Sequence, residues 1–373
     1  MTSLNDRKKT RRPGAGERSG DGDRMDRLSD LADFGGNSGA LRARFYVPDP
    51  LRPGAALVVV LHGCLQTAEG YDHGAGWSTL ADAHGFALLL PEQRRENNPN
   101  GCFNWFQPGD TGRDEGEVAS IRAMVATMVA AHAIDPARVF ITGLSAGGAM
   151  AGAMLAAYPE VFAGGAIVAG LPVGAASNVT QAMTAMRGGG TVDAAVLAAR
   201  VRGASTYPGP WPRISVWHGD ADQVVSPANA DAIVTQWRLV HGLHVAPSCT
   251  ERAHGREHRI WRGADRRDAV EQWIVAGMGH GTPIHADGAP GGGAAMPYML
   301  DVGLASTRHI AASWGLLPGV AEKTLPDAPT PPPAKHSARV LTPEPLDAAR
   351  WRNAPNGVAK IIQEALRVAG LMK

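Results

Sequence analysis

The feature that constrains the fold most is a stretch in which an apolar strand runs through a Gly-x-Ser-x-Gly motif into an alanine-rich helix. It covers residues 139–151 and reads Val-Phe-Ile-Thr-Gly-Leu-Ser-Ala-Gly-Gly-Ala-Met-Ala, with Ser145 at its centre. Glycines on both sides of the serine allow a strand-to-helix turn so tight that larger side chains would collide there. Such a turn presents the serine hydroxyl at the carboxyl edge of a sheet, next to the first N–H groups of the helix. We therefore predict that Ser145 is a nucleophile and that the N–H of Ala146 donates to a developing oxyanion.

Short apolar runs alternate with helical stretches on both sides of this turn. Runs of strand type lie at 43–48, 56–61, 86–91, 139–142, 162–168 and 214–217, and apolar spacing predicts helices at 77–84, 116–132, 145–157 and 227–240. This alternation is typical of an α/β fold with a mainly parallel sheet and helices on both faces. We predict a catalytic domain over residues 41–316. A segment rich in Ala, Gly and Met at 172–211 interrupts the pattern and is predicted as a cap insertion.

The two ends of the chain differ in composition from this domain. Residues 1–40 mix basic and acidic side chains with Gly and Ser, which predicts a disordered arm without the apolar stretch of a secretory signal. Residues 317–354 are rich in proline, as expected of a stiff linker. Residues 355–373 carry apolar side chains on one helical face. We expect this amphipathic helix either to pack on its own domain or to support self-association or attachment to an apolar surface.

Composition excludes several classes of protein. The chain has 36 Lys and Arg residues against 35 Asp and Glu, so no strong positive field exists to bind a nucleic acid. No run of 18 apolar residues occurs, which argues against a membrane span. The histidine and cysteine spacings contain no HExxH or CxxC motif, so we predict no metal site.

A nucleophilic serine at such a turn requires a carboxylate and a histidine, which follow it in the chain in this order. Asp220 and Asp222 come directly after the predicted strand 214–217, in the sequence His-Gly-Asp-Ala-Asp. We prefer Asp222 as the carboxylate that orients the histidine, because Val224 and Val225 would fix the loop behind it. For either aspartate the alternative is a solvated turn residue.

The chain has 13 histidines, and His280 has the sequence surroundings that a general base needs. It lies in Gly-Met-Gly-His-Gly, after a strand predicted around 272–275, and the glycines let its ring reach into a cleft. We therefore predict His280 as the base. His62 and His218 are expected to fix their own loops by hydrogen bonding. Surface or loop positions are expected for His254, His258, His285 and His309.

A second oxyanion donor is expected from the loop after the early strand 56–61, where the sequence reads His-Gly-Cys. The N–H of Cys64 is our candidate. The Cys64 side chain is either a small buried group or half of a disulfide with Cys102, which would leave Cys249 free. A disulfide would pin the oxyanion loop against the aromatic residues that follow Cys102.

Five motifs in order resemble the poly(3-hydroxybutyrate) depolymerase family of esterases over about residues 41–315: HGCLQ at 62–66, CFNW at 102–105, GLSAGG at 143–148, HGDAD at 218–222 and GMGH at 277–280. The resemblance implies an α/β-hydrolase fold and a serine esterase without a cofactor. Its superfamily includes feruloyl and acetylxylan esterases. Secreted members carry a signal peptide, so the resemblance points to secretion whereas the sequence before residue 40 points to the cytoplasm.

Three functions remain open at this stage. The leading hypothesis is hydrolysis of short-chain hydroxyalkanoate esters, as polyester or small ester, through an acyl-enzyme on Ser145. Phe103, Trp105 and Phe106 would then form one wall of the substrate groove, and core packing is their alternative. The second hypothesis is a carbohydrate esterase that removes feruloyl or acetyl groups. The third is a non-catalytic protein that binds a polyester surface or a partner.

Overall fold

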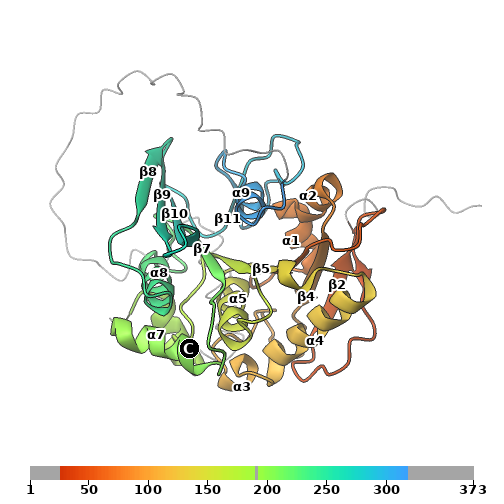
Figure 1. Ribbon diagram of the computed structural model, residues 1–373, viewed down its shortest axis with the longest axis horizontal. Coiled ribbons are helices and arrows are strands. Elements are labelled where there is room, and N and C mark those ends of the chain that lie inside the picture. The colour runs from red at the N-terminus through yellow and green to blue at the C-terminus, as the bar shows by residue number, and fades with distance from the viewer. Residues whose placement is uncertain (1–25, 190–191, 318–373) are drawn as a thin grey trace, which may run out of the picture.

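The computed structural model describes residues 26–189 and 192–317, which form a ten-stranded sheet with helices on both faces (Figure 1). Six central strands are parallel, in the order β4-β3-β5-β6-β7-β10, and antiparallel strands extend the sheet at both edges. From one edge to the other the strands are β1 (Ser29–Asp30), β2 (Arg42–Tyr46), β4 (Ala87–Glu92), β3 (Leu57–Leu61), β5 (Val139–Leu144), β6 (Gly164–Val168), β7 (Arg213–Gly219), β10 (Asp268–Val275), β9 (Arg256–Arg262) and β8 (Cys249–Ala253). The prediction of a mainly parallel α/β fold is therefore confirmed.

The helices lie in two layers that enclose the sheet. Along the chain they are α1 (Ala68–Ala75), α2 (Trp77–His84), α3 (Pro108–Thr111), α4 (Gly116–Ala131), η1 (Pro136–Arg138), α5 (Ala146–Ala157), α6 (Val179–Met186), α7 (Ala194–Gly203), α8 (Ala228–Val240) and α9 (Ser306–Ser313). A separate pair of parallel strands, β11 (Thr282–Ile284) and β12 (Met299–Asp301), lies beyond β10 in the sequence. The predicted helices at 77–84, 116–132, 145–157 and 227–240 correspond to α2, α4, α5 and α8.

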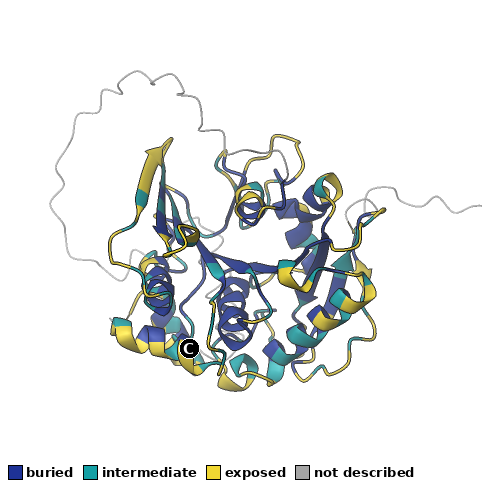
Figure 2. Cartoon of the chain, viewed as in Figure 1, coloured by how far each residue is buried: buried dark blue, intermediate teal, exposed yellow. Residues whose placement is uncertain are grey.

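Alternation along β3 shows why the sheet needs both layers. Leu57, Val59 and Leu61 pack into the core beneath α4, α5 and α8, whereas Val58 and Val60 pack into the core with α1, α2 and α9. All five side chains are buried, and Figure 2 shows the central strands as a buried band between the two layers. A strand that is buried on both faces has a continuous run of apolar residues, and this run predicted β3 from the sequence.

Residues 26–40 are ordered, so the predicted disordered arm is wrong for this part. Leu28 is buried, and β1 pairs with β2 in antiparallel register. The charged side chains that suggested disorder have partners on β2: Arg44 contacts Asp26 at 2.8 Å and Arg42 contacts Asp30 at 2.9 Å. The arm before residue 26, the proline-rich linker and the amphipathic helix at 355–373 lie outside the described residues. Across 26–189 and 192–317, no helix is long and apolar enough to cross a membrane.

The predicted cap insertion at 172–211 contains α6 and α7, and polar side chains of α8 attach it to the domain. Gln236, fully buried, donates to the carbonyl oxygens of Val173 at 3.0 Å and Leu197 at 2.8 Å. Asn229 donates to the carbonyl oxygen of Ala185, near the end of α6, at 3.0 Å. These bonds fix α6 at the carboxyl edge of the sheet, where the site lies.

Candidate active site

Ser145 occupies the turn between β5 and α5 in a backbone conformation that side chains rarely adopt, with φ 57° and ψ −116°. Its N–H donates to the carbonyl oxygen of Val168 at 2.9 Å, which holds the turn in place. A Cβ atom at Gly143 would lie 2.3 Å from the carbonyl oxygen of Gly147, and one at Gly147 would lie 2.4 Å from that of His62. Only glycine fits these two positions, so the motif is required by the packing of three backbone segments.

Asp222 lies in the loop after β7 and makes a 2.7 Å hydrogen bond through Oδ2 to Nδ1 of His280. Its other oxygen, Oδ1, accepts from the N–H groups of Val224 at 2.8 Å and Val225 at 2.9 Å. The two valines therefore act as the sequence suggested: they fix the carboxylate. Its side chain is fully buried.

The environment of Asp222 keeps this carboxyl group ionised. Burial acts to raise the pKa of Asp222, but hydrogen bonds from His218 and His280 and from the Val225 N–H lower it well below its usual value. An ionised carboxylate at Nδ1 fixes the histidine tautomer in which Nε2 carries no proton.

Asp220, in the same loop, makes different contacts from Asp222. Its Oδ1 accepts from the N–H of Gly277 at 2.6 Å, and the N–H of Ala221 donates to the carbonyl oxygen of Met278 at 3.1 Å. The loop after β7 and the loop that carries His280 are thus joined by one side-chain and one backbone hydrogen bond. The structure brings Asp222 to His280 and gives Asp220 a role in attaching the two loops.

His218 and His62 fix their loops, as expected. His218 Nε2 lies 2.9 Å from the carbonyl oxygen of Val225 and 3.2 Å from Oδ2 of Asp222. His62 contacts the carbonyl oxygen of Gly63 through Nδ1 at 2.7 Å. Burial lowers the pKa of His62, which keeps this ring neutral.

His258 does not lie at the surface, so this expectation was wrong. It is buried against Trp273, with ring centroids 3.8 Å apart, and its Nε2 lies 2.7 Å from a carboxylate oxygen of Glu271. A position in the last strands of the sheet, rather than in a loop, accounts for the difference. His254 and His309 are exposed, and so is His285.

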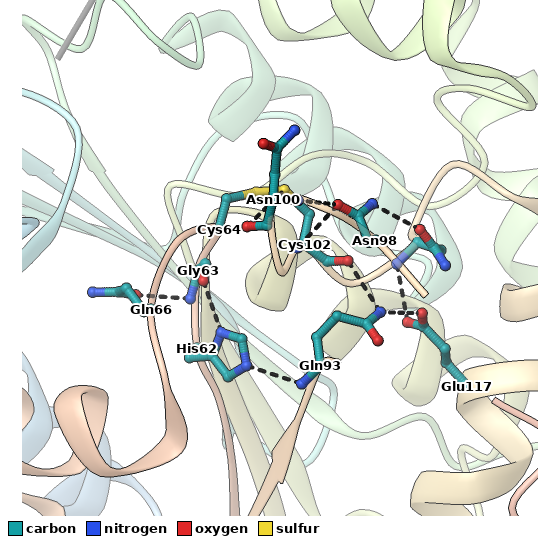
Figure 3. The surroundings of a disulfide bond; sticks show 10 residues. His62, Gly63, Cys64, Gln66, Gln93, Asn98, Asn100, Cys102 and Glu117 are labelled. Carbon is teal, nitrogen blue, oxygen red and sulfur yellow. Dashed lines mark hydrogen bonds between the residues drawn. A yellow bond between two sulfur atoms is a disulfide. The ribbon is translucent and has the colours of Figure 1, made fainter. Parts of the chain in front are cut away.

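A disulfide joins Cys64 to Cys102, which confirms that prediction and leaves Cys249 free (Figure 3). It ties the loop after β3 to the loop after β4, and the N–H of Leu65 reinforces the tie by donating to the carbonyl oxygen of Asn100 at 2.8 Å. Within the described part of the chain, the N–H groups of Cys64 and Ala146 donate to no acceptor. Both predicted oxyanion donors are therefore free to bind an oxygen.

Glu117, which no sequence motif indicates, supports the Cys102 side of the disulfide (Figure 3). Glu117 is fully buried at the start of α4, and it accepts from the Asn104 N–H at 3.0 Å and from the Gln93 amide. The same amide donates to the carbonyl oxygen of Cys102 at 3.0 Å. Burial raises the pKa of Glu117 to about 8, against the effect of its hydrogen bonds. From the sequence of α4 alone, Glu117 cannot be distinguished from a glutamate on a solvent-exposed helix face.

A cavity of about 340 Å³ opens onto Ser145 and His280. Trp105 and Phe106 form part of one wall, edge to face with centroids 5.6 Å apart. Phe103, predicted beside them, is instead fully buried and packs on the His62 ring at 5.0 Å. The alternative of core packing therefore holds for Phe103, which belongs to the buried core on the α4 and α5 side of the sheet.

Other lining residues come from segments that the motifs did not indicate. Helix α6 contributes Val179, Ala182, Met183 and Met186, which form an apolar wall. Tyr298, just before β12, contributes a further aromatic ring that meets His280 edge to face at 6.2 Å. Over the described ranges, no group of His, Cys, Asp and Glu side chains is arranged to hold a metal ion.

Comparison with known proteins agrees with this geometry. Residues 43–261 match the family model described as Esterase PHB depolymerase. Poly(3-hydroxyalkanoate) depolymerase C of Paucimonas lemoignei is 43% identical over 78% of this chain and 70% of its own length. Feruloyl esterase B of Talaromyces funiculosus is 30% identical over 69% of this chain and 73% of its own. Among solved structures, an acetyl xylan esterase from Aspergillus awamori superposes with a TM-score of 0.67 at 25% identity, covering 78% of this chain and 99% of that one.

Proposed function

The chain belongs to the Esterase PHB depolymerase family of carboxylic ester hydrolases, and from this premise we propose that Ser145, His280 and Asp222 are its catalytic triad. The observation that carries the proposal is the 2.7 Å contact between His280 and a buried, ionised Asp222, at a cavity that Ser145 also lines. Membership of a family of esterases leaves no support for the non-catalytic alternative.

The proposed reaction proceeds through an acyl-enzyme. Ser145 Oγ attacks the ester carbonyl carbon while Nε2 of His280 takes the hydroxyl proton. The N–H groups of Cys64 and Ala146 donate to the oxygen that becomes negative. The C–O bond to the leaving alcohol then breaks, and His280 gives its proton to that alcohol oxygen. Water, deprotonated by the same histidine, hydrolyses the acyl-serine ester and restores Ser145.

The cavity lining supports an uncharged substrate. Its residues include no Asp, Glu, Lys or Arg, so nothing there would pair with a charged acyl group. The α6 wall and the two aromatic rings of the disulfide loop offer apolar contact instead. We therefore propose short-chain hydroxyalkanoate esters as the substrates, the class to which the substrate in the Paucimonas relative's name belongs.

One observation favours a carbohydrate ester as the second candidate. Six side-chain amides line the cavity, at Gln66, Asn97, Asn98, Asn100, Asn104 and Gln107, and amides bind sugar hydroxyls. Several of them have structural partners: the Asn98 amide group donates to Asn104, and its oxygen accepts from two backbone N–H groups. Among the described residues, the side-chain amides of Asn100 and Gln107 and the amide nitrogen of Gln66 have no partner, which leaves three amides with free groups for a hydroxylated substrate.

The test combines a substrate panel with matched variants. The wild type is assayed on methyl 3-hydroxybutyrate, the linear 3-hydroxybutyrate dimer, methyl ferulate and acetylated xylan. Ser145→Ala, His280→Ala and Asp222→Ala should each lower kcat on the order of 10⁴-fold, and a double variant should lose little more, because the triad acts as a unit. Asp220→Ala is the comparison: it removes one contact between the two loops but leaves His280 its carboxylate, so it should lose far less activity than Asp222→Ala.

Two results would contradict the proposal. Loss of activity in Asp220→Ala with near wild-type activity in Asp222→Ala would refute the carboxylate assignment. A strong preference for methyl ferulate or acetylated xylan over both hydroxybutyrate esters would transfer the substrate assignment to the second candidate.

A further inference from the structure

We propose that Tyr298 forms the subsite for the leaving alcohol and so determines which alcohol half of an ester is accepted. The inference rests on the proposed function, in which His280 is the proton donor. Tyr298 lines the same cavity as Ser145 and His280, and it belongs to none of the sequence motifs. It lies within residues 285–305, which connect β11 to α9 and which we call the strap.

The strap is fixed on α1, whose place beside β11 and α9 can be followed in Figure 1. The N–H of Ala294 donates to the carbonyl oxygen of Gly74 at 3.0 Å. Met296 and Met299 press so closely on the same glycine that a Cβ atom there would lie 2.7 and 2.6 Å from their side chains. The strap is therefore a packed segment with a defined position at the cavity.

The backbone of Tyr298 is held in the left-handed region, with φ 67°. This conformation is uncommon for a bulky aromatic residue, and such strain is concentrated at functional sites. The carbonyl oxygen of Tyr298 accepts from the N–H of Thr282 at 2.8 Å, two residues after His280. The same contact therefore fixes the loop of the base and directs the Tyr298 ring, which meets the His280 ring edge to face.

The chemistry of the reaction determines what this ring contacts. His280 must give its proton to the oxygen of the departing alcohol, so that alcohol lies beside the imidazole. Tyr298 is the aromatic side chain of the cavity lining that meets the His280 ring, whereas Trp105 and Phe106 lie on the disulfide loop. The ring is thus placed to pack against the alcohol half of the ester.

The hydroxyl group of Tyr298 adds a polar requirement. Its oxygen has no hydrogen-bond partner among residues 26–189 and 192–317, and burial alone raises the pKa of this hydroxyl. In a hydroxyacid polyester the leaving alcohol is the next unit of the chain, which carries a carbonyl or carboxylate close to the departing oxygen and offers acceptors but almost no donors. A phenolic O–H supplies the donor that such a leaving group needs.

The test compares two series of esters. In the first, the 3-hydroxybutyryl group is constant and the leaving alcohol is methanol or 3-hydroxybutyrate. In the second, methanol is constant and the acyl group is acetyl, butyryl or 3-hydroxybutyryl. Tyr298→Phe keeps the ring, and Tyr298→Gly removes it while suiting the positive φ. Tyr298→Asn, which also tolerates this conformation, guards against a folding defect in the glycine variant.

We expect Tyr298→Gly and Tyr298→Asn to lower kcat/KM for the dimer about tenfold more than for methyl 3-hydroxybutyrate. Ratios within the acyl series should stay at the wild-type values. Tyr298→Phe should match the wild type on the methyl esters and lose activity on the dimer only. kcat/KM is the readout because it reports acylation, in which the alcohol departs.

Equal losses for all esters, with a shifted acidic limb of the pH profile, would show that Tyr298 acts only through His280 and would overturn the inference. Discrimination between acyl groups would also overturn it. A wild-type enzyme that fails to hydrolyse either hydroxybutyrate ester would refute the proposed function instead, so the two failures are distinguishable.

Discussion

Removing the disulfide should destabilise the protein and loosen the oxyanion loop at the same time. The bond between Cys64 and Cys102 spans 38 residues. In the chain-entropy account, a loop of this length contributes roughly 4 kcal/mol to the free energy of unfolding. For a folded unit of about 290 residues this corresponds to a fall in Tm of roughly 6 °C.

The assay compares Cys64→Ser/Cys102→Ser with Cys249→Ser as the matched control. Cys249 is the cysteine without a disulfide and lies on the edge strand β8, so its replacement should leave Tm and activity near wild type. Urea denaturation should show a lower midpoint for the double variant and a larger m-value, because an unfolded chain without the cross-link exposes more surface. A count of thiols in the denatured wild type should give one.

The kcat of Cys64→Ser/Cys102→Ser should fall by less than the complete loss of one oxyanion donor would cause. Losing such a donor costs about 10² to 10³ in kcat, but the Leu65 to Asn100 hydrogen bond still restrains the loop, so we expect a loss of about tenfold. A double variant that melts within about 1 °C of the wild type, where the chain-entropy account requires roughly 6 °C, would refute the reasoning. So would three free thiols in the wild type.

Three further outcomes follow from the structure. Gly147→Ala should abolish activity because its Cβ would lie 2.4 Å from the His62 carbonyl oxygen. Gly152→Ala in the same helix, where a Cβ meets side chains at 3.5 Å, should raise the free energy of unfolding by about 0.5–1 kcal/mol. Thermal melts and kinetic assays of both variants check the two outcomes. Burial raises the pKa of Glu117 from 4.5 to about 8, so its contribution to stability is full below pH 4.5 and is lost as the pH rises towards 8. Urea midpoints at pH 5 and 8.5 should therefore differ more for the wild type than for Glu117→Gln, and parallel pH dependence would contradict this. Trp105→Ala should reduce hydrolysis of hydroxybutyrate oligomers more than that of a chromogenic acetate, whereas equal losses would indicate a structural role.

The central strands and the Ser145 turn could be predicted because their signals are local. A strand buried on both faces must be apolar throughout, and a backbone contact of 2.3 Å at Gly143 permits no other residue. The preference for Asp222 over Asp220 also came from local sequence, because the N–H groups that fix the carboxylate belong to the next residues in the chain.

What the sequence did not reveal depends on distant contacts. Strand β8 is largely exposed, and its polar sequence is typical of a loop. It is a strand because it pairs with β9, and this pairing leaves no apolar pattern in the sequence. Glu117 looks like a surface residue of α4, and only the folded loop after β4 buries it. Residues 26–40 seemed too charged to fold because their ion-pair partners on β2 could not be recognised from composition.

This division between local and distant signals has a consequence for substrate choice. Ser145, Asp222 and His280 lie in the turns and loops that follow the parallel strands β5, β7 and β10, where short sequence motifs hold them. The apolar wall of α6 and the strap with Tyr298 come from an insertion and from a segment beyond the family match, which ends at residue 261. Relatives named for a polyester, a feruloyl ester and acetylxylan match 78%, 69% and 70% of this chain. Substitutions in α6 and the strap can therefore change the accepted ester while leaving the catalytic geometry intact, which is where exchange of substrate preference between such relatives should first be sought.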